Sequence, residues 1–128
     1  MLERTFQHCL LVTGVAVGFA LDIGFASLDV RRLGLAATLH DIGKAHIPLS
    51  ILDKPGCLDP GEDEIMRRHP VIGYELLKDS SDINPEILDA VRHHHEYLDG
   101  SGYPSADSAG DFRSGKIADD LRYLRRSY

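Results

Sequence analysis

Apolar residues recur along the chain at helical spacing, so the hydrophobic pattern predicts helices rather than strands. The first run, residues 5–25, is apolar on nearly every side, and its glycines, including Gly14 and Gly18, would let neighbouring helices approach closely. A second helix is expected to begin at residues 27–29, which offer N-cap side chains, and to end at His40. Period-two alternation of useful length is absent, so the predicted fold class is all-α.

Prolines and glycines divide the next part of the chain into shorter pieces. Residues 47–59 are punctuated in this way and are expected to form a connector with turns. A helix is predicted to begin around residues 60–63, where a proline and acidic residues suit a first turn. The pair His69-Pro70 interrupts it, and a further helical piece is expected over residues 71–77.

Asn84 and Pro85 mark the start of another predicted helix, with the asparagine as cap and the proline at the first helical position. This helix leads to three consecutive histidines. Residues 97–115 form a long irregular stretch, and loops of this length inside a compact domain are usually functional. A last helix is predicted over residues 116–126. We find no internal repeat and no domain boundary, and 128 residues suit one domain.

The composition, with 43% apolar and 27% charged residues, is typical of a globular protein. A net charge of -6 argues against a DNA partner, because proteins that bind the nucleic-acid backbone normally present a basic face. The charge does not exclude a small anionic substrate, since bound cations reverse the local field. Two cysteines, Cys9 and Cys57, make no disulfide framework and indicate a reducing compartment.

Residues 10–21 (LLVTGVAVGFAL) form the one stretch that could pass for a targeting segment. The run is too short to span a bilayer, and the residues before it include Glu3 and Arg4 without the net positive charge of a signal peptide. We therefore expect a buried first helix, a cytoplasmic protein and no membrane partner.

Histidine and aspartate at predicted helix ends are the candidate chemistry. His40 and Asp41 end the second helix and are followed by Gly43 and Lys44. Burying an unpaired carboxylate and imidazole is costly, and a divalent metal resolves the problem because both groups are good ligands. A satisfied histidine beside a surface aspartate is the simpler interpretation of such a pair in isolation.

The pair is not isolated, because other predicted helix ends carry the same kinds of side chain. The candidate ligands are His40, Asp41, His69, His94 and His95, with His8 and Asp119 as further candidates. Successive helical residues point about 100° apart, so adjacent ligands straddle two ions more naturally than they share one. Neither cysteine has the short spacing of a structural zinc site. A solvated histidine cluster at a helix end remains the alternative.

Two segments resemble the motifs of the HD-GYP family, a branch of the HD metal-dependent phosphohydrolases. The first is HDIGK at residues 40–44, and the second is HHEYLDGSGYP at residues 94–104, which leaves His93 outside the motif. The resemblance runs from about Thr5 to at least Pro104. It implies an HD-domain helical bundle, a centre of two or three metals, and hydrolysis of cyclic di-GMP to linear pGpG or onward to GMP.

The resemblance also implies roles for individual residues. Asp41, as the bridging ligand, and Lys44, on the scissile phosphate, would be catalytic. The metal ligands would be His8, His40, Asp41, His69, His94, His95 and Asp119. The substrate-binding residues would be Lys44, Asp99, Gly100, Gly102, Tyr103 and Pro104. Some members place a third-metal glutamate at the position of Arg4, so two divalent ions are expected here. Iron or manganese is favoured, with zinc, nickel or magnesium as alternatives.

The C-terminal segment departs from the family pattern. The family expects a further aspartate ligand in an Ala-Asp-x-x-Asp-Ala-Leu segment, and this chain offers Ala118-Asp119-Asp120-Leu121, closer than usual to the preceding motif. We choose Asp119 over Asp120. The expected organisation is a single HD-GYP-like domain over residues 1–128, shortened at its C-terminal end.

In the mechanism expected from these residues, two ions lower the pKa of a shared water towards roughly 7, and the resulting metal-bridging hydroxide attacks the phosphodiester. Lys44 and the ions take up the charge that develops on the phosphate oxygens. Two alternatives stay open: a weak or inactive module that binds a nucleotide or a protein, and an HD phosphohydrolase acting on another nucleotide or phosphodiester. A homodimer, or association with a signalling-domain protein, is a further prediction.

Overall fold

The computed structural model describes residues 2–97 and 101–104, and over these residues it contains helices and no strand, which confirms the all-α prediction. The elements are α1 (Leu2–Asp22), α2 (Ser27–Leu39), the 3-10 helix η1 (Ile42–His46), α3 (Leu49–Leu52), α4 (Pro60–Met66), α5 (His69–Leu77) and α6 (Pro85–His93). The predicted helix over residues 116–126 lies outside the described residues.

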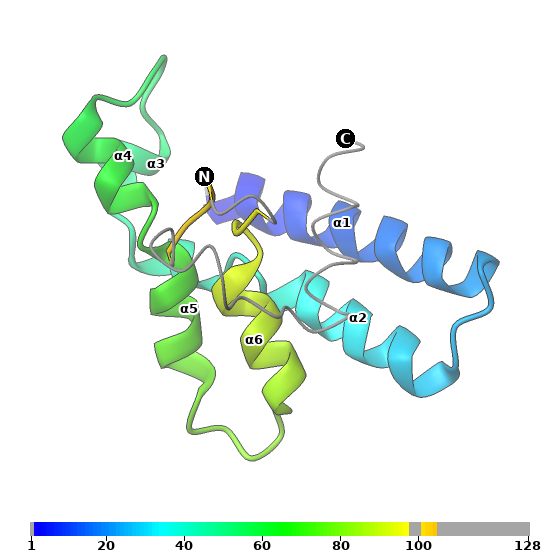
Figure 1. Ribbon diagram of the computed structural model, residues 1–128. Coiled ribbons are helices and arrows are strands. Elements are labelled where there is room, and N and C mark those ends of the chain that lie inside the picture. Colours follow the sequence, from blue (N-terminus) through cyan, green and yellow to red (C-terminus); the bar gives the residue numbers. More distant parts are fainter. Residues whose placement is uncertain (1, 98–100, 105–128) are drawn as a thin grey trace.

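Two helical hairpins form the frame of the molecule (Figure 1). Helices α1 and α2 pack against each other, α5 packs against α6, and the hairpins meet through α2 and α6. Short α3 and α4 lie together beyond the N-terminal end of α5. The core between the hairpins is rich in alanine and β-branched residues, which let helix axes come close: Ala16, Ala20, Val30, Leu33, Ala36, Ala37, Ile87, Ala90 and Val91.

Local signals fix the starts of α4 and α6 as predicted. Asp59 and Glu62 form a reciprocal capping box at α4, in which each side chain accepts a hydrogen bond from the other residue's backbone N–H. The side chain of Asn84 accepts hydrogen bonds from two backbone N–H groups at the start of α6. The expected side-chain cap of α2 is wrong, because its N-cap residue is Ala26, which makes no such bond.

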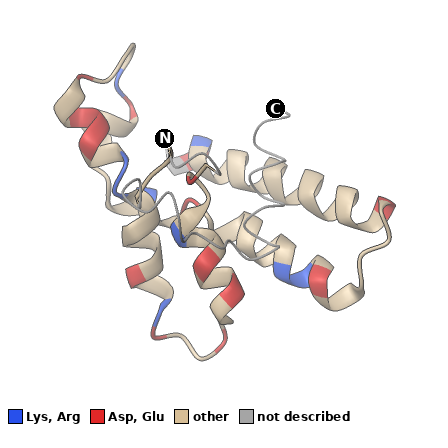
Figure 2. Cartoon of the chain, in the orientation of Figure 1, with Lys and Arg blue, Asp and Glu red and all other residues tan. Residues whose placement is uncertain are grey.

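The expectation of a buried first helix is also wrong. Helix α1 contacts α2 through small residues such as Ala16 and Ala20, while Leu10, Leu11 and Leu21 are each more than half exposed. Figure 2 shows α1 uncharged along nearly its whole length. Residues Glu3–Asp22 are long and apolar enough to cross a membrane, although a single such helix near the N-terminus is weak evidence for a span. The absence of a membrane partner therefore stays a prediction.

The glycines of α1 do not have the predicted role among the described residues. A Cβ atom built at Gly14 or Gly18 meets nothing within 4 Å, so neither glycine allows a close helix contact there. The close backbone contact occurs instead between η1 and α5, at Gly43 and Gly73. A Cβ atom at Gly43 would lie 1.9 Å from the carbonyl oxygen of His69 and 2.7 Å from the backbone nitrogen of Gly73. This contact brings η1 directly against the first turns of α5.

Candidate metal centre

Three helix ends bring their histidines to one buried point. Helix α2 ends at Leu39 and delivers His40 and Asp41, α5 begins at His69, and α6 is followed by His94. These four side chains are buried, with 1–2% of their residue surface exposed. A helix end leaves backbone groups without intrahelical partners, so polar side chains near it are expected. The burial of three imidazoles around one carboxylate is the unusual feature.

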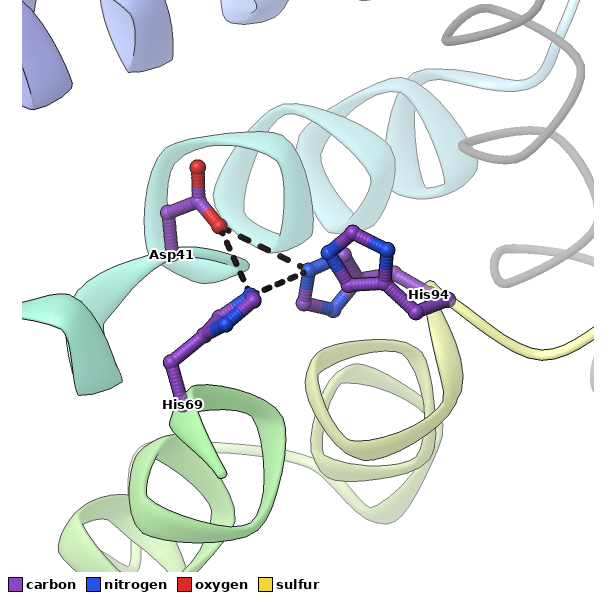
Figure 3. A group of neighbouring side chains, drawn as sticks. Asp41, His69 and His94 are labelled. Carbon is purple, nitrogen blue, oxygen red and sulfur yellow. Dashed lines mark hydrogen bonds and ion pairs between the residues drawn. The ribbon is translucent and has the colours of Figure 1, made fainter. Parts of the chain in front are cut away.

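The carboxylate of Asp41 lies at the centre of the group, with its two oxygens facing different histidines. Oδ1 lies 3.2 Å from Nε2 of His69 and 3.6 Å from Nε2 of His94 (Figure 3). Oδ2 lies 3.3 Å from Nε2 of His40 and 3.9 Å from Nε2 of His8, which is half-exposed on α1. Each oxygen of one carboxylate therefore faces its own set of imidazole nitrogens.

The three buried histidines have the same orientation relative to their own helices. In each, Nδ1 lies within hydrogen-bonding distance of the backbone carbonyl three residues earlier: His40 with Ala37 (2.6 Å), His69 with Met66 (2.8 Å) and His94 with Val91 (2.8 Å). A carbonyl oxygen only accepts, so Nδ1 carries the proton and a neutral ring directs the lone pair of Nε2 towards Asp41. This is the tautomer that metal-ligating histidines with a backbone partner adopt.

The ligand atoms form two groups of the size that a metal ion needs. Within each group the atoms lie within 4.8 Å of one another: Asp41, His69, His94 and His95 in the first, and His8, His40 and Asp41 in the second. Nε2 of His40 is buried without a hydrogen-bond partner. Such an orphaned nitrogen is costly in a buried site and fits a metal ligand. The donor set of imidazole and carboxylate therefore fits a divalent metal.

Electrostatics keep the cluster in the protonation state that metal ligands require. Burial disfavours the ionised carboxyl group of Asp41, but the surrounding imidazoles of His40, His69 and His94 outweigh it and hold its pKa well below the usual range. Burial lowers the pKa of His94 from 6.5 to about 3, which keeps its ring neutral. Burial and the Asp41 carboxylate raise the pKa of the Cys9 thiol to about 11. Cys9 is therefore a protonated thiol near neutral pH in the metal-free chain.

Lys44 and the loop residues 101–104 lie at the edge of the cluster. The ammonium of Lys44 donates a hydrogen bond to Oδ2 of Asp41 at 2.7 Å. The ring of Tyr103 stacks on the imidazole of His95, with centroids 4.5 Å apart and planes inclined by 17°. A Cβ atom at Gly102 would lie 2.4 Å from the carbonyl oxygen of His95, so only glycine fits where the loop passes this backbone.

The structure thus brings together the predicted residues His8, His40, Asp41, Lys44, His69, His94, His95, Gly102, Tyr103 and Pro104 at or beside one site. Predicted residues Asp99, Gly100 and Asp119 lie outside the described residues. His93, which the motif excludes, turns away to pair with Asp89 on its own helix. Sequence reasoning missed Arg67, whose guanidinium carbon lies 5.0 Å from the ring centroid of Tyr103, because its spacing carries no motif. Glu96, the third residue of the second motif, is also buried.

A helical fold with a histidine and aspartate cluster at its helix ends defines a class of metal-dependent phosphohydrolase domain. The chain belongs to the HD domain family, whose model matches residues 5–126.

Relatives of this chain are named as enzymes that act on cyclic dinucleotides. A cyclic di-GMP phosphodiesterase of Pseudomonas aeruginosa is 40% identical over 102 residues, which cover 80% of this chain and 25% of the relative. The cyclic di-GMP phosphodiesterase response regulator RpfG of Xanthomonas campestris is 51% identical over 87 residues, 66% of this chain and 23% of the relative. A 3'3'-cGAMP-specific phosphodiesterase of Vibrio cholerae is 39% identical over 112 residues, 82% of this chain and 22% of the relative.

These matches confirm the resemblance to the HD-GYP branch. The chain spans about a quarter of the length of these curated relatives, so the matched region is one part of each of them.

Proposed function

We propose that this chain is a metal-dependent phosphodiesterase domain that hydrolyses cyclic di-GMP to linear pGpG or onward to GMP. Two findings support the substrate class: the names of the relatives, and the HD-GYP motifs that place Lys44 and Tyr103 beside the cluster. The observation that carries the proposal is the buried Asp41 carboxylate, whose two oxygens face separate sets of imidazole nitrogens.

The same carboxylate supports a centre of two divalent ions, with Asp41 as the shared ligand. His8 and His40 would complete one set and His69, His94 and His95 the other. Asp119 is a further predicted ligand outside the described residues. A donor set of imidazole and carboxylate without thiolate suits iron or manganese, with zinc, nickel or magnesium as alternatives.

Bound there, such ions supply Lewis acidity and an activated water for attack on a phosphodiester. The chain's own residues supply position and charge. The carbonyl partners of His40, His69 and His94 fix the rings before any ligand binds. Lys44 holds an ammonium beside Asp41, where it can take up negative charge on a phosphate oxygen as the reaction proceeds.

The direct test replaces the shared ligand. Asp41→Ala is expected to lose bound metal and to lower the turnover of cyclic di-GMP by at least about 100-fold, measured by elemental analysis and by chromatography of the products. The matched control is Asp29→Ala on α2, the helix that precedes Asp41, where the carboxylate pairs with Arg32 at the surface. This control should keep both metal and turnover. Retention of both by Asp41→Ala would show that the assignment is wrong.

A substrate panel distinguishes the alternatives. The relative specific for 3'3'-cGAMP makes that dinucleotide the second candidate substrate, so it is compared with cyclic di-GMP in the same assay. Binding of cyclic di-GMP without release of pGpG or GMP would identify an inactive binding module instead of an enzyme. Hydrolysis of a generic phosphodiester alone would identify an HD phosphohydrolase of another specificity.

The organisation of residues 1–128 as a single HD-GYP-like domain is part of this proposal. Association with a second copy of the chain or with a signalling-domain protein stays a prediction.

A further inference from the structure

Three flat side chains form a continuous stack beside the cluster. The imidazole of His95 stacks on the ring of Tyr103, with centroids 4.5 Å apart and planes inclined by 17°. The guanidinium carbon of Arg67 lies over the same tyrosine ring, 5.0 Å from its centroid. A guanidinium is planar and delocalised, so it covers an aromatic face better than an ammonium does.

Arg67, at one end of this stack, also forms a hydrogen bond within α4. Nε of Arg67 donates a hydrogen bond to Oδ2 of Asp63, one helical turn earlier, at 2.6 Å. Arg67 is the C-cap residue of α4, and the capping box at Asp59 and Glu62 fixes the other end of this helix. A series of contacts therefore runs from the body of α4 through Arg67 and Tyr103 to a candidate metal ligand.

His95 is the candidate ligand that this stack touches. His95 follows the end of α6 and lies against the loop residues 101–104. Its ring contacts are His94, at a centroid distance of 4.4 Å, and His69, at 4.9 Å. Its stack on Tyr103 therefore links the position of the His95 ring to Arg67, 28 positions earlier in the chain.

We propose that Arg67 is a positioning residue of the metal centre, which packs on the Tyr103 ring that stacks on His95 and so holds the imidazole where it can share an ion with Asp41, His69 and His94. This inference rests on the proposed function of the cluster as a metal centre. It predicts that Arg67 acts on metal affinity through Tyr103 and not through its own charge.

The chain offers a matched control in the next residue. Arg68 also forms an ion pair one turn back, with Glu64 at 3.5 Å, and among the described residues it covers no aromatic ring. Both arginine side chains are more than half exposed, so truncating either should leave the fold intact. A difference between Arg67→Ala and Arg68→Ala therefore reports the stack rather than the loss of one positive charge from α4.

The experiment measures binding of Mn²⁺ to the 128-residue chain by calorimetric titration, with the thermal unfolding midpoint of each metal-free variant as a folding check. Arg67→Ala is expected to weaken Mn²⁺ binding about 2- to 5-fold, the effect typical of an exposed cation–π contact, and Arg67→Lys to weaken it less. Tyr103→Leu should weaken it about 10-fold, as removal of a ligand's supporting partner does. Arg68→Ala should match the unaltered chain.

A double-variant cycle decides whether the effect passes through the ring. In the Tyr103→Leu background, Arg67→Ala should produce no further loss of Mn²⁺ affinity. The visible absorption of the Co²⁺-loaded chain is a second readout, and it should change in Arg67→Ala in the direction seen for Tyr103→Leu. An effect of Arg67→Ala that equals that of Arg68→Ala, or that persists in the Tyr103→Leu background, would overturn the proposal.

The outcome is separable from that of the proposed function. If the unaltered chain binds Mn²⁺ and the cycle behaves as expected but cyclic di-GMP is not hydrolysed, the phosphodiesterase proposal fails and the role of Arg67 stands. If the chain binds neither Mn²⁺ nor Co²⁺, the metal centre and the role of Arg67 fail together.

Discussion

Gly43 occupies a position where the backbones of η1 and α5 touch. The carbonyl oxygen of His69 and the backbone nitrogen of Gly73 occupy the space that a side chain would need. Because η1 follows Asp41 directly and α5 begins at His69, any separation of these two backbones would also move the carboxylate from the imidazole. The glycine of the first motif is therefore a packing requirement of the site.

A pair of glycine substitutions tests this point. Gly43→Ala should lower the free energy of unfolding by about 1–3 kcal/mol, because a well-packed contact has to open to admit a methyl group. Gly14→Ala, at an exposed position inside α1 where the added carbon meets nothing within 4 Å, should raise it by about 0.5–1 kcal/mol. Urea unfolding of both variants measures the two values, and equal changes of the same sign would contradict the interpretation.

For individual residues, the sequence predicts the candidate ligands better than it predicts the residues that pack against them. His40, Asp41 and His94 stand at helix ends in long motifs, so their types and spacing are informative. Arg67 contacts Tyr103 only through tertiary packing, and no spacing along the chain connects residues 36 positions apart. The sequence also did not show that Gly14 faces away from the neighbouring helix. A helix that is apolar on nearly every side does not reveal which side packs against its neighbour.

Helix α6 shows how an element positions a candidate ligand. The helix begins with the cap residue Asn84 followed by Pro85. Its inner face is buried through Ile87, Ala90 and Val91, and His94 follows its last residue. The start of the helix therefore sets the direction in which the histidine leaves it.

Removing the cap of α6 should loosen the whole element. Asn84→Ala is expected to lower the free energy of unfolding by about 0.5–2 kcal/mol, because two backbone N–H groups lose their acceptor. Asn84→Ser retains a capping oxygen and should cost much less. Thermal or urea unfolding checks the pair, and an alanine variant as stable as the serine variant would show that the cap contributes nothing.

Caps with a proline at the first helical position were predictable, whereas short and uncapped elements were not. The starts of α4 and α6 carry side-chain caps beside prolines, and the structure confirms both. Helix α2 begins after Ala26 without a cap bond, because its packing against α1 and α6 stabilises it instead. The four-residue α3 and the 3-10 helix η1 were missed, since elements of one turn carry no periodicity.

Across the whole molecule, the cluster makes stability depend on pH. The pKa of His94 is lowered by burial from 6.5 to about 3, so between these values the unfolded chain binds a proton that the folded chain does not. The free energy of unfolding therefore rises with pH in this window and falls as the solution is acidified. Asp41, whose pKa is also lowered, adds a loss of the same sign below its ordinary value of 3.8.

The expected result is that chelator-treated protein loses stability steadily from pH 7 to pH 4 in urea unfolding. His94→Leu should reduce this slope, because the substituted residue has no proton to bind. A stability that stays constant from pH 7 to pH 4 would show that His94 is not held neutral by the fold.

The fold class and the convergence of most candidate site residues followed from sequence, because both depend on local patterns: helical spacing, and histidine and aspartate residues in contiguous motifs. The exposure of α1 did not follow, because burial is a property of the assembled helices. An apolar run of this composition suits a core helix and a surface helix equally well.

The backbone partners of His40, His69 and His94 have one more consequence. They hold each ring in the tautomer that is less populated in free histidine, so the helices themselves have already selected the form that coordinates through Nε2. In nitrogen-15 spectra of the metal-free chain near neutral pH, the His94 ring should show one protonated and one bare nitrogen without averaging between them. Binding of a metal ion should then require little rearrangement of the protein. The rate of binding would be limited by the loss of water from the ion and by its entry into the cluster.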